Sequence, residues 1–384
     1  MAFDDIAGHE TAKQVLTRAI LTDRVSHAYL FEGPAHVGKT LTAVAFAKAL
    51  MCAEPSQPGE SCNACAVCRA VERGNHPDFL LLRPSVRLEA EDEEGQRTAA
   101  EIEGSMISVE AIGRLISEAN LRVVSARRKV FIVTSAETMN DAAANRLLKT
   151  LEEPPGETTI ILTAASTSAL LPTIVSRCQL VRFGPVPVDE TAAALERLFP
   201  EAEAALVRSV AALSGGRPGW ARRLLEHPDT LSIRNGLLDL AARLPAQPMV
   251  GCMKAAETLI DSAEAWWNAT TQGKYSAQLL KENRDRVLRT QIGDLLDILL
   301  TWFRDLSIAG QEGSGGLLIN ADRAPQLEQL AAQAPAGAPA RAAAAIRQAK
   351  ESLSGNANLR LAVEVMLIDI WQALATTSPT PIPG

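Results

Sequence analysis

The sequence predicts a parallel α/β domain followed by two helical domains, and three observations support this fold class. Short apolar runs that suit strands alternate with helical patterns over residues 27–183, which is typical of a parallel sheet covered by helices. A glycine-rich motif lies between the first such strand and the first long helix. Beyond Pro187 only helical patterns remain. We therefore expect domains at residues 1–184, 185–227 and 228–377, with a disordered tail over residues 378–384.

Composition and charge narrow the class of protein. Of the 384 residues, 47% are hydrophobic and 22% are charged, which suffices for the cores of two or three domains. The aromatic share of 4% favours an Ala- and Leu-rich helical protein over a β-sandwich. The formal net charge of −7 gives no general attraction for nucleic acid, so contact with DNA requires a local patch or a partner.

The sequence carries no signal of a membrane or secreted protein. It has no run of 18 apolar residues, and its acidic start does not resemble a signal peptide. We expect a cytoplasmic protein with no membrane partner. In that compartment the six cysteines are expected to be thiols or metal ligands rather than disulfides.

A phosphate-binding loop follows the first expected strand. The pattern G-x-x-x-x-G-K-[ST] is complete at Gly33, Gly38, Lys39 and Thr40, with a strand expected over residues 27–31 and a helix over residues 41–50. The glycines let backbone N–H groups face phosphate oxygens at a helix N-terminus. Lys39 is expected to bind the terminal phosphates of ATP or ADP, and Thr40 the Mg²⁺ ion. Pro34 is also expected to contact the nucleotide. His36 stands where many such loops carry glycine. The alternative is a chance match in a turn before a helix.

Four cysteines within 17 residues form a predicted zinc site. They are Cys52, Cys62, Cys65 and Cys68. Two C-x-x-C steps share Cys65, and this spacing can place four sulfur atoms around one Zn²⁺ ion. An iron–sulfur cluster is the second interpretation, but it normally has a further Cys followed by Pro downstream, which is missing here. Unligated thiols in a loop are the third.

An acidic segment at residues 84–105 interrupts the alternation of strands and helices. It follows a short expected strand at residues 76–82 and carries seven Asp or Glu residues between Glu89 and Glu103. This composition predicts a flexible, solvated insertion. A patch that mimics DNA is the alternative. Order is expected to resume at Ser108, a helix cap for residues 111–119.

The strand expected at residues 129–134 ends without the acidic pair that P-loop ATPases use. In such enzymes an Asp at this strand end holds Mg²⁺, and a following Glu polarises the attacking water. Thr134 and Ser135 stand at these two positions. Because a hydroxyl cannot act as a general base at neutral pH, we expect slow hydrolysis even if nucleotide binds. Glu137 lies two residues further on and is the weaker alternative for the catalytic carboxylate.

The rest of the chain completes the predicted sheet and helices. A helix is expected over residues 141–153 and a strand over residues 159–163. In the predicted C-terminal domain, two sets of apolar residues recur at helical spacing, so each set shares one face of a helix. These sets are Leu288, Ile292, Leu295, Leu299 and Phe303, and Leu359, Val363, Met366, Ile370 and Leu374. Linkers are expected at residues 310–316 and 334–339.

Several of these segments together resemble the bacterial clamp-loader AAA+ family. The likeness rests on His27-Ala28-Tyr29-Leu30-Phe31, the cysteine loop, the run Leu-Leu-Lys-Thr-Leu-Glu-Glu-Pro-Pro at residues 147–155 and Ser176-Arg177-Cys178. It covers nearly the whole chain. The resemblance implies an AAA+ module, a helical lid and a helical collar through which five subunits form a ring. It also implies that Arg177 projects towards ATP on a neighbouring subunit, that Arg217 senses nucleotide from the lid, and that a polar residue near Thr163 reads nucleotide state.

The same resemblance implies a function and a set of partners. Clamp loaders of the DNA polymerase III holoenzyme, a DNA-directed DNA polymerase, load a sliding clamp onto primer-template DNA, with gamma/tau and delta subunits in the ring. The gamma/tau motors carry an Asp-Glu pair where this chain has Thr134 and Ser135, so the resemblance is to a non-motor member. A gamma/tau-like ATPase is the alternative, because the loop at residues 33–40 is intact. A small-molecule kinase is a third interpretation, which the long C-terminal helices oppose.

Overall fold

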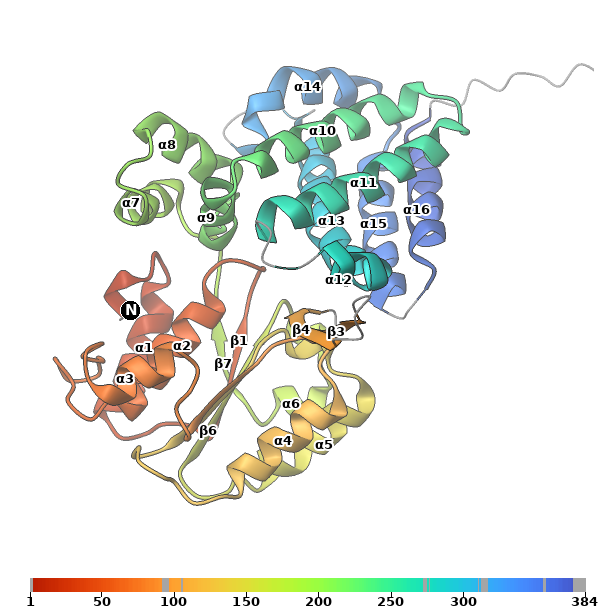
Figure 1. Cartoon of the computed structure of the whole chain (residues 1–384). Helices are drawn as coiled ribbons and strands as arrows, with labels where there is room; N and C mark the ends of the chain where they lie inside the picture. Colours follow the sequence, from red (N-terminus) through yellow and green to blue (C-terminus); the bar gives the residue numbers. More distant parts are fainter. Residues whose placement is uncertain are drawn as a thin grey trace, which may run out of the picture. The chain divides into compact units, whose positions relative to one another are not determined.

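The computed structural model divides the chain into two compact units (Figure 1). Unit 1 comprises Met1–Val86 and Glu103–Leu225, and unit 2 comprises Arg87–Ile102 and Glu226–Gly384. The described residues are 3–91, 97–104, 106–271, 275, 277–309, 311, 317–354 and 357–375. The predicted tail at 378–384, most of the predicted linker at 310–316 and part of the acidic segment therefore lie outside the described residues.

Unit 1 contains a parallel sheet of five strands in the order β2-β5-β6-β1-β7. The strands are β1 (Ala28–Glu32), β2 (Phe79–Leu82), β5 (Lys129–Val133), β6 (Thr158–Ala164) and β7 (Gln179–Arg182). Strands β5 and β6 begin and end within one residue of their predicted positions. Strand β2 begins three residues later than predicted, because Pro77 and Asp78 form a turn. In a parallel sheet all carboxyl ends meet at one edge, so the turns after β1, β5 and β6 converge there. The predicted parallel α/β domain is confirmed.

Helices pack on both faces of this sheet, as Figure 1 shows. One apolar cluster joins the sheet to α1 (Glu10–Leu21), α2 (Lys39–Met51) and α3 (Ala66–Glu72). The other joins it to α4 (Val109–Ala119), α5 (Asp141–Glu152) and α6 (Pro172–Val175). Because successive strand residues point to opposite faces, Phe31 packs in the first cluster and Leu30 in the second. A continuous apolar strand thus fits the centre of a covered sheet.

Unit 1 ends in short helices that follow the sheet. These are α7 (Val188–Leu198), α8 (Ala204–Leu213) and α9 (Pro218–Glu226). Trp220 on α9 is buried, at 4% exposure. Its position just after the Gly215-Gly216 turn brings the start of α9 to the phosphate loop through a backbone contact, Gly219 N to His36 O.

The acidic segment is not simply a flexible loop, so that prediction is wrong for its flanks. It contains a two-stranded sheet of β3 (Ser85–Glu91) and β4 (Arg97–Glu103). The sequence alternates Val86, Leu88 and Ala90 with polar residues, which is the two-residue period of a strand. A high density of charge therefore does not exclude strands in this segment. Residues 92–96 and 105 lie outside the described residues.

Unit 2 is helical apart from strands β3 and β4. Its helices are α10 (Asp229–Arg243), α11 (Gly251–Thr271), α12 (Ala277–Glu282), α13 (Arg284–Ala309), α14 (Ala324–Gln333), α15 (Ala338–Ser354) and α16 (Leu359–Leu374). Both predicted apolar faces are buried, one on α13 and one on α16. Among the described helices, none is long and apolar enough to cross a bilayer.

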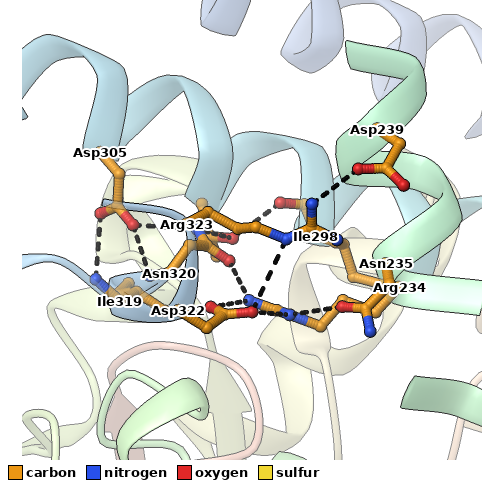
Figure 2. A network of polar contacts seen from close by, with 10 residues as sticks. Arg234, Asn235, Asp239, Ile298, Asp305, Ile319, Asn320, Asp322 and Arg323 are labelled. Carbon is orange, nitrogen blue, oxygen red and sulfur yellow. Dashed lines mark hydrogen bonds and ion pairs between the residues drawn. The ribbon is translucent and has the colours of Figure 1, made fainter. Parts of the chain in front are cut away.

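A buried polar network fixes the turn at residues 319–322, before α14 (Figure 2). The carboxylate of Asp305 is fully buried and accepts hydrogen bonds from the amides of Ile319 at 3.2 Å and Asn320 at 2.6 Å. The guanidinium of Arg234, on α10, donates to both carboxylate oxygens of Asp322 at 2.9 and 3.0 Å. Buried polar groups stabilise a fold only when all are paired, so the turn depends on these side chains.

Replacing Asp305 with Ala should therefore destabilise unit 2. The substitution leaves the buried amide of Asn320 and the partly buried amide of Ile319 without acceptors. A buried amide without a partner costs about 1–3 kcal/mol, so we expect a loss of about 3 kcal/mol in the free energy of unfolding. Urea denaturation measures the loss, and hydrogen exchange should become faster at Ile319 and Asn320. Asp261→Ala, on the exposed face of α11, is the matched control and should change stability by less than about 0.5 kcal/mol. Equal stability of both variants would show that the network does not hold this turn.

Candidate nucleotide and metal sites

The phosphate loop connects β1 to α2, and its glycines are required by geometry. Gly33 has φ 153° and Gly38 has φ 113°, both in the region that favours glycine. A Cβ atom on Gly33 would lie 2.1 Å from the carbonyl oxygen of Phe183, so no side chain fits. The amide of Gly33 donates to the carbonyl of Ala164 at 3.1 Å. The loop is therefore anchored to the neighbouring strand β6 at its first residue.

Lys39 lies inside this loop at the start of α2. Its Nζ donates to the carbonyls of Gly33 at 2.5 Å and Pro34 at 2.6 Å, and the residue is 9% exposed. Burial lowers the pKa of Lys39 to about 8, while the negative charge of Glu137 acts to raise it. Thr40 follows in the first turn of α2. A phosphate group received by the helix N-terminus would meet the Lys39 ammonium, so the donor set fits a nucleotide phosphate.

Helix α9 and the residue His9 both contact the phosphate loop, and neither contact was predicted from the sequence. Helix α9 makes the first of these contacts. The amide of Gly219, on α9, donates to the carbonyl of His36 at 2.9 Å. His36 has φ 63°, which is unusual for a residue other than glycine, and its ring centroid lies 6.0 Å from that of Trp220. The guanidinium of Arg217 lies over the same Trp220 ring at 5.7 Å, and its Nε donates to the carbonyl of Ser214 at 2.9 Å. The predicted lid arginine, Arg217, thus packs on Trp220, and Trp220 in turn lies beside His36 of the loop.

His9 holds the next residue of the loop. Its Nε2 lies 2.8 Å from the carbonyl of Val37, and its ring packs against Phe183 with centroids 4.8 Å apart. Burial lowers the pKa of His9, which keeps the imidazole neutral and able to donate to this carbonyl at neutral pH. The Gly8-His9-Glu10 sequence before α1 was the only signal available, and it gave no indication of a partner 28 residues away.

The turn after β5 contains no carboxylate at its first two positions. The hydroxyl of Thr134 donates to the carbonyl of Leu82, on β2, at 3.3 Å. Ser135 has φ 50°, and its amide donates to the hydroxyl oxygen of Thr163 at 3.1 Å. Thr163 is buried at the end of β6. These hydrogen bonds join the end of β5 to β2 and β6. The hydroxyls of Thr134 and Ser135 cannot serve as general bases.

Glu137 lies closer to the loop than its position in the sequence suggested. Its Oε1 accepts a hydrogen bond from the amide of Ala165 at 3.1 Å. Ala165 directly follows the residue whose carbonyl anchors Gly33. The interaction of its charge with Lys39 agrees with this placement. The structure therefore brings the carboxylate of Glu137, the weaker alternative in the sequence, beside the phosphate loop.

The four predicted zinc ligands lie together at the end of α2, in the loop that follows it and in the first turn of α3. Their sulfur atoms all lie within 4.8 Å of one another. Individual Sγ–Sγ distances are 3.6 Å for Cys52 and Cys62, 4.0 Å for Cys52 and Cys65, and 3.9 Å for Cys62 and Cys68. Sulfur atoms about 2.3 Å from a tetrahedral zinc ion lie about 3.8 Å apart, so the cluster fits Zn²⁺.

Backbone amides prepare this cluster for the charge of thiolates. The amide of Cys65 donates to the sulfur of Cys62 at 3.2 Å, and that of Cys68 donates to the sulfur of Cys65 at 3.4 Å. Although burial acts to raise it, hydrogen bonds to the sulfur of Cys65, first among them the one from the amide of Cys68, lower the pKa of Cys65 to about 6. Burial raises the pKa of Cys52 and Cys68. Binding of a metal ion to all four sulfurs must therefore release protons.

Arg177 lies near the amino-terminal end of β7, whereas the phosphate loop lies at the carboxyl-terminal end of the neighbouring strand β1. It precedes β7, whose first residue Gln179 lies beside Tyr29 near the start of β1. Gly33 follows the opposite end of β1, about 13 Å further along a strand. The guanidinium of Arg177 is 34% exposed and pairs with Glu152, at the end of α5, at 2.6 Å. It also donates to the carbonyl of Thr173 at 3.0 Å. Arg177 therefore does not belong to the nucleotide site of its own chain.

A second polar cluster contains Ser, His and Asp side chains but lacks the arrangement of a hydrolase. Asp78 accepts hydrogen bonds from the amides of Val124 and Ser125, both at 2.8 Å, and does not orient the imidazole. The amide of Asp78 donates to Nδ1 of His76 at 3.0 Å. Nε2 must then carry the proton and donate to the Ser125 hydroxyl at 3.3 Å. His76 cannot accept a proton from Ser125 in this tautomer, so the cluster is structural.

Comparison with known proteins agrees with these features. The family described as "DNA polymerase III, delta subunit" matches residues 8–187, and "DNA polymerase III, delta subunit, C terminal" matches residues 268–372. The DNA polymerase III subunit delta' of Pseudomonas aeruginosa is 38% identical over 202 residues, which are 52% of this chain and 56% of that protein. The subunit delta' of Escherichia coli K12 is 32% identical over 248 residues, covering 64% of this chain and 69% of that protein.

A tau subunit and a solved structure are also similar to this chain. The DNA polymerase III subunit tau of Bacillus subtilis is 26% identical over 380 residues, covering 96% of this chain and 61% of that protein. A gamma subunit-related protein of Thermotoga maritima has 18% identity and a TM-score of 0.38, with 94% of this chain and 99% of that chain covered. The chain thus spans little more than half the length of the Pseudomonas and Bacillus relatives that it matches.

The sheet, the loop and the helices that follow define a P-loop protein of the AAA+ class. The predicted fold class is confirmed. Within that class, the chain belongs to the family of DNA polymerase III subunit delta'.

Proposed function

We propose that this chain acts as a non-motor subunit of a clamp loader and lends Arg177 to ATP held by a neighbouring subunit. The position of Arg177 carries this proposal. Its guanidinium lies at the edge of the sheet opposite the phosphate loop and is partly exposed. A guanidinium set against a γ-phosphate stabilises charge that develops during phosphoryl transfer. Arg177 can do this only for nucleotide bound to another chain.

The turn after β5 supports a non-motor role. Thr134 and Ser135 supply hydroxyl and amide groups that bond to β2 and β6. Neither can activate water at neutral pH, so turnover at this chain's own loop should be slow. The intact loop around Lys39 supports binding of ATP or ADP with Mg²⁺. The alternative, a gamma/tau-like motor, requires a catalytic carboxylate from elsewhere.

The proposal extends to the assembly in which the chain works. The complex is a five-subunit ring with gamma/tau and delta subunits that loads a sliding clamp onto primer-template DNA in the cytoplasm. The net charge of −7 supports DNA contact through the assembled ring rather than through this chain alone. Residues 1–184 serve as the AAA+ module, 185–227 as the lid and 228–377 as the collar. Zn²⁺ bound by the four clustered cysteines orders the loop at residues 52–68.

Hydrolysis by the separate and combined components tests this proposal. ATP binding and phosphate release are measured for the isolated chain, for gamma/tau with delta, and for all of them with primed DNA and sliding clamp. We expect negligible phosphate release from the isolated chain, and a DNA-stimulated rate that appears only when the chain completes the ring. Brisk release from the isolated chain would support the motor alternative. A ring that reaches full rate without the chain would reject its role.

A further inference from the structure

Glu137 reaches from the end of β5 across β6 towards the phosphate loop. It lies in the one-turn helix Ala136–Thr138, which begins after the left-handed residue Ser135. Its Oε1 accepts from the amide of Ala165 at 3.1 Å. The preceding residue, Ala164, accepts from the amide of Gly33 at 3.1 Å. The carboxylate is thus held one residue from the point where the loop leaves the sheet.

The other carboxylate oxygen of Glu137 is buried without a partner. Among the residues that the structure describes, Glu137 Oε2 is the only carboxylate oxygen that is buried without a hydrogen-bond partner. A buried polar atom without a partner costs on the order of 1–3 kcal/mol. Such groups are rare in folded proteins and are concentrated at functional sites. This oxygen is available to accept a hydrogen bond from a ligand.

The second carboxylate at this edge of the sheet is already engaged. Glu32, the last residue of β1, accepts from the amide of Thr167 at 2.8 Å and pairs with Arg182 at 3.4 Å. Its charge is thereby compensated within the protein. Thr134 and Ser135 carry no charge. Of these two carboxylates, Glu137 is therefore the one that remains for a ligand of this loop.

We propose that Glu137 couples nucleotide binding at the phosphate loop to Mg²⁺, in place of the acidic pair missing at Thr134 and Ser135. The inference rests on the proposed nucleotide binding at this loop. A carboxylate beside the loop repels the phosphates of free ATP. It attracts Mg²⁺, which keeps several waters when bound and presents them to nearby carboxylates. Glu137 should thus weaken binding of metal-free ATP and strengthen binding of Mg-ATP.

The experiment compares the dissociation constants of a fluorescent ATP analogue in excess EDTA and in excess Mg²⁺. For Glu137→Gln the ratio of the EDTA value to the Mg²⁺ value should fall on the order of tenfold, because one charge near the ligand is removed. Glu137→Asp should restore part of the ratio. Glu196→Gln, on the exposed side of α7, makes the same change of charge and should leave the ratio unchanged. Lys39→Ala checks that the analogue binds at this loop.

Three results would overturn the inference. The first is an unchanged ratio in folded Glu137→Gln. The second is an equal shift of both dissociation constants, which would indicate a purely structural effect. The third is wild-type protein that binds no nucleotide in either condition. That result would leave the proposed role of Arg177 intact, because a ring in which Arg177 serves a neighbouring subunit needs no nucleotide on this chain.

Discussion

Replacing Arg177 with Ala should remove most ATP hydrolysis at the adjacent site of a reconstituted ring without unfolding this chain. An arginine supplied in trans contributes about 10³–10⁵ to the rate of phosphoryl transfer, so the site that depends on Arg177 should become almost inactive. The ion pair of Arg177 with Glu152 is partly exposed on both sides, and such pairs contribute about 0–1 kcal/mol. The measurement is DNA-stimulated phosphate release by the ring, with thermal unfolding of the chain as the check on folding.

Glu152→Gln is the matched control for Arg177→Ala. It removes the ion pair at 2.6 Å and keeps the guanidinium. If Arg177 acts on a neighbouring ATP, the ring with Glu152→Gln should retain most of its rate. If both variants lose the same activity, Arg177 acts through its bond to Glu152 and stabilises only its own chain. A wild-type rate with Arg177→Ala would remove the trans role altogether.

The phosphate loop and the cysteine cluster were predictable because their geometry is local. Gly33 and Gly38 take the positive φ values that the pattern requires, and the helix after Lys39 follows from the Ala- and Leu-rich sequence. Cys62, Cys65 and Cys68 meet because one turn joins each pair. In both cases the residues that interact lie within 16 positions of one another, from Cys52 to Cys68 at most.

The contacts missed from the sequence join residues far apart in the chain. Glu137 meets Ala165 only because β5 and β6 are neighbours with a defined register. His9 meets Val37 across 28 positions. Alternating strands and helices predict a parallel sheet, but they do not specify which strand ends lie together. The direction of the Glu137 side chain therefore could not be derived from the turn in which it lies.

Substitution of Cys65 with Ser is expected to release zinc and loosen the loop at residues 52–68. The sulfur of Cys65 lies 4.0 Å from that of Cys52, and its pKa of about 6 makes it a ready thiolate ligand. Structural zinc sites contribute on the order of 10 kcal/mol to folding, so loss of one ligand should remove much of that stabilisation. Elemental analysis gives the zinc content, and hydrogen exchange or proteolysis within the loop gives its order.

Cys178→Ser is the matched control, because Cys178 lies outside the cluster and its loss should leave one zinc ion per chain. Acid should release zinc from the wild type, since protons compete with the metal for four sulfurs and burial raises the pKa of Cys52 and Cys68. Wild-type protein from zinc-supplemented cells that contains no zinc would reject the assignment. Iron and sulfide in its place would instead support the iron–sulfur interpretation, with the same four cysteines as ligands.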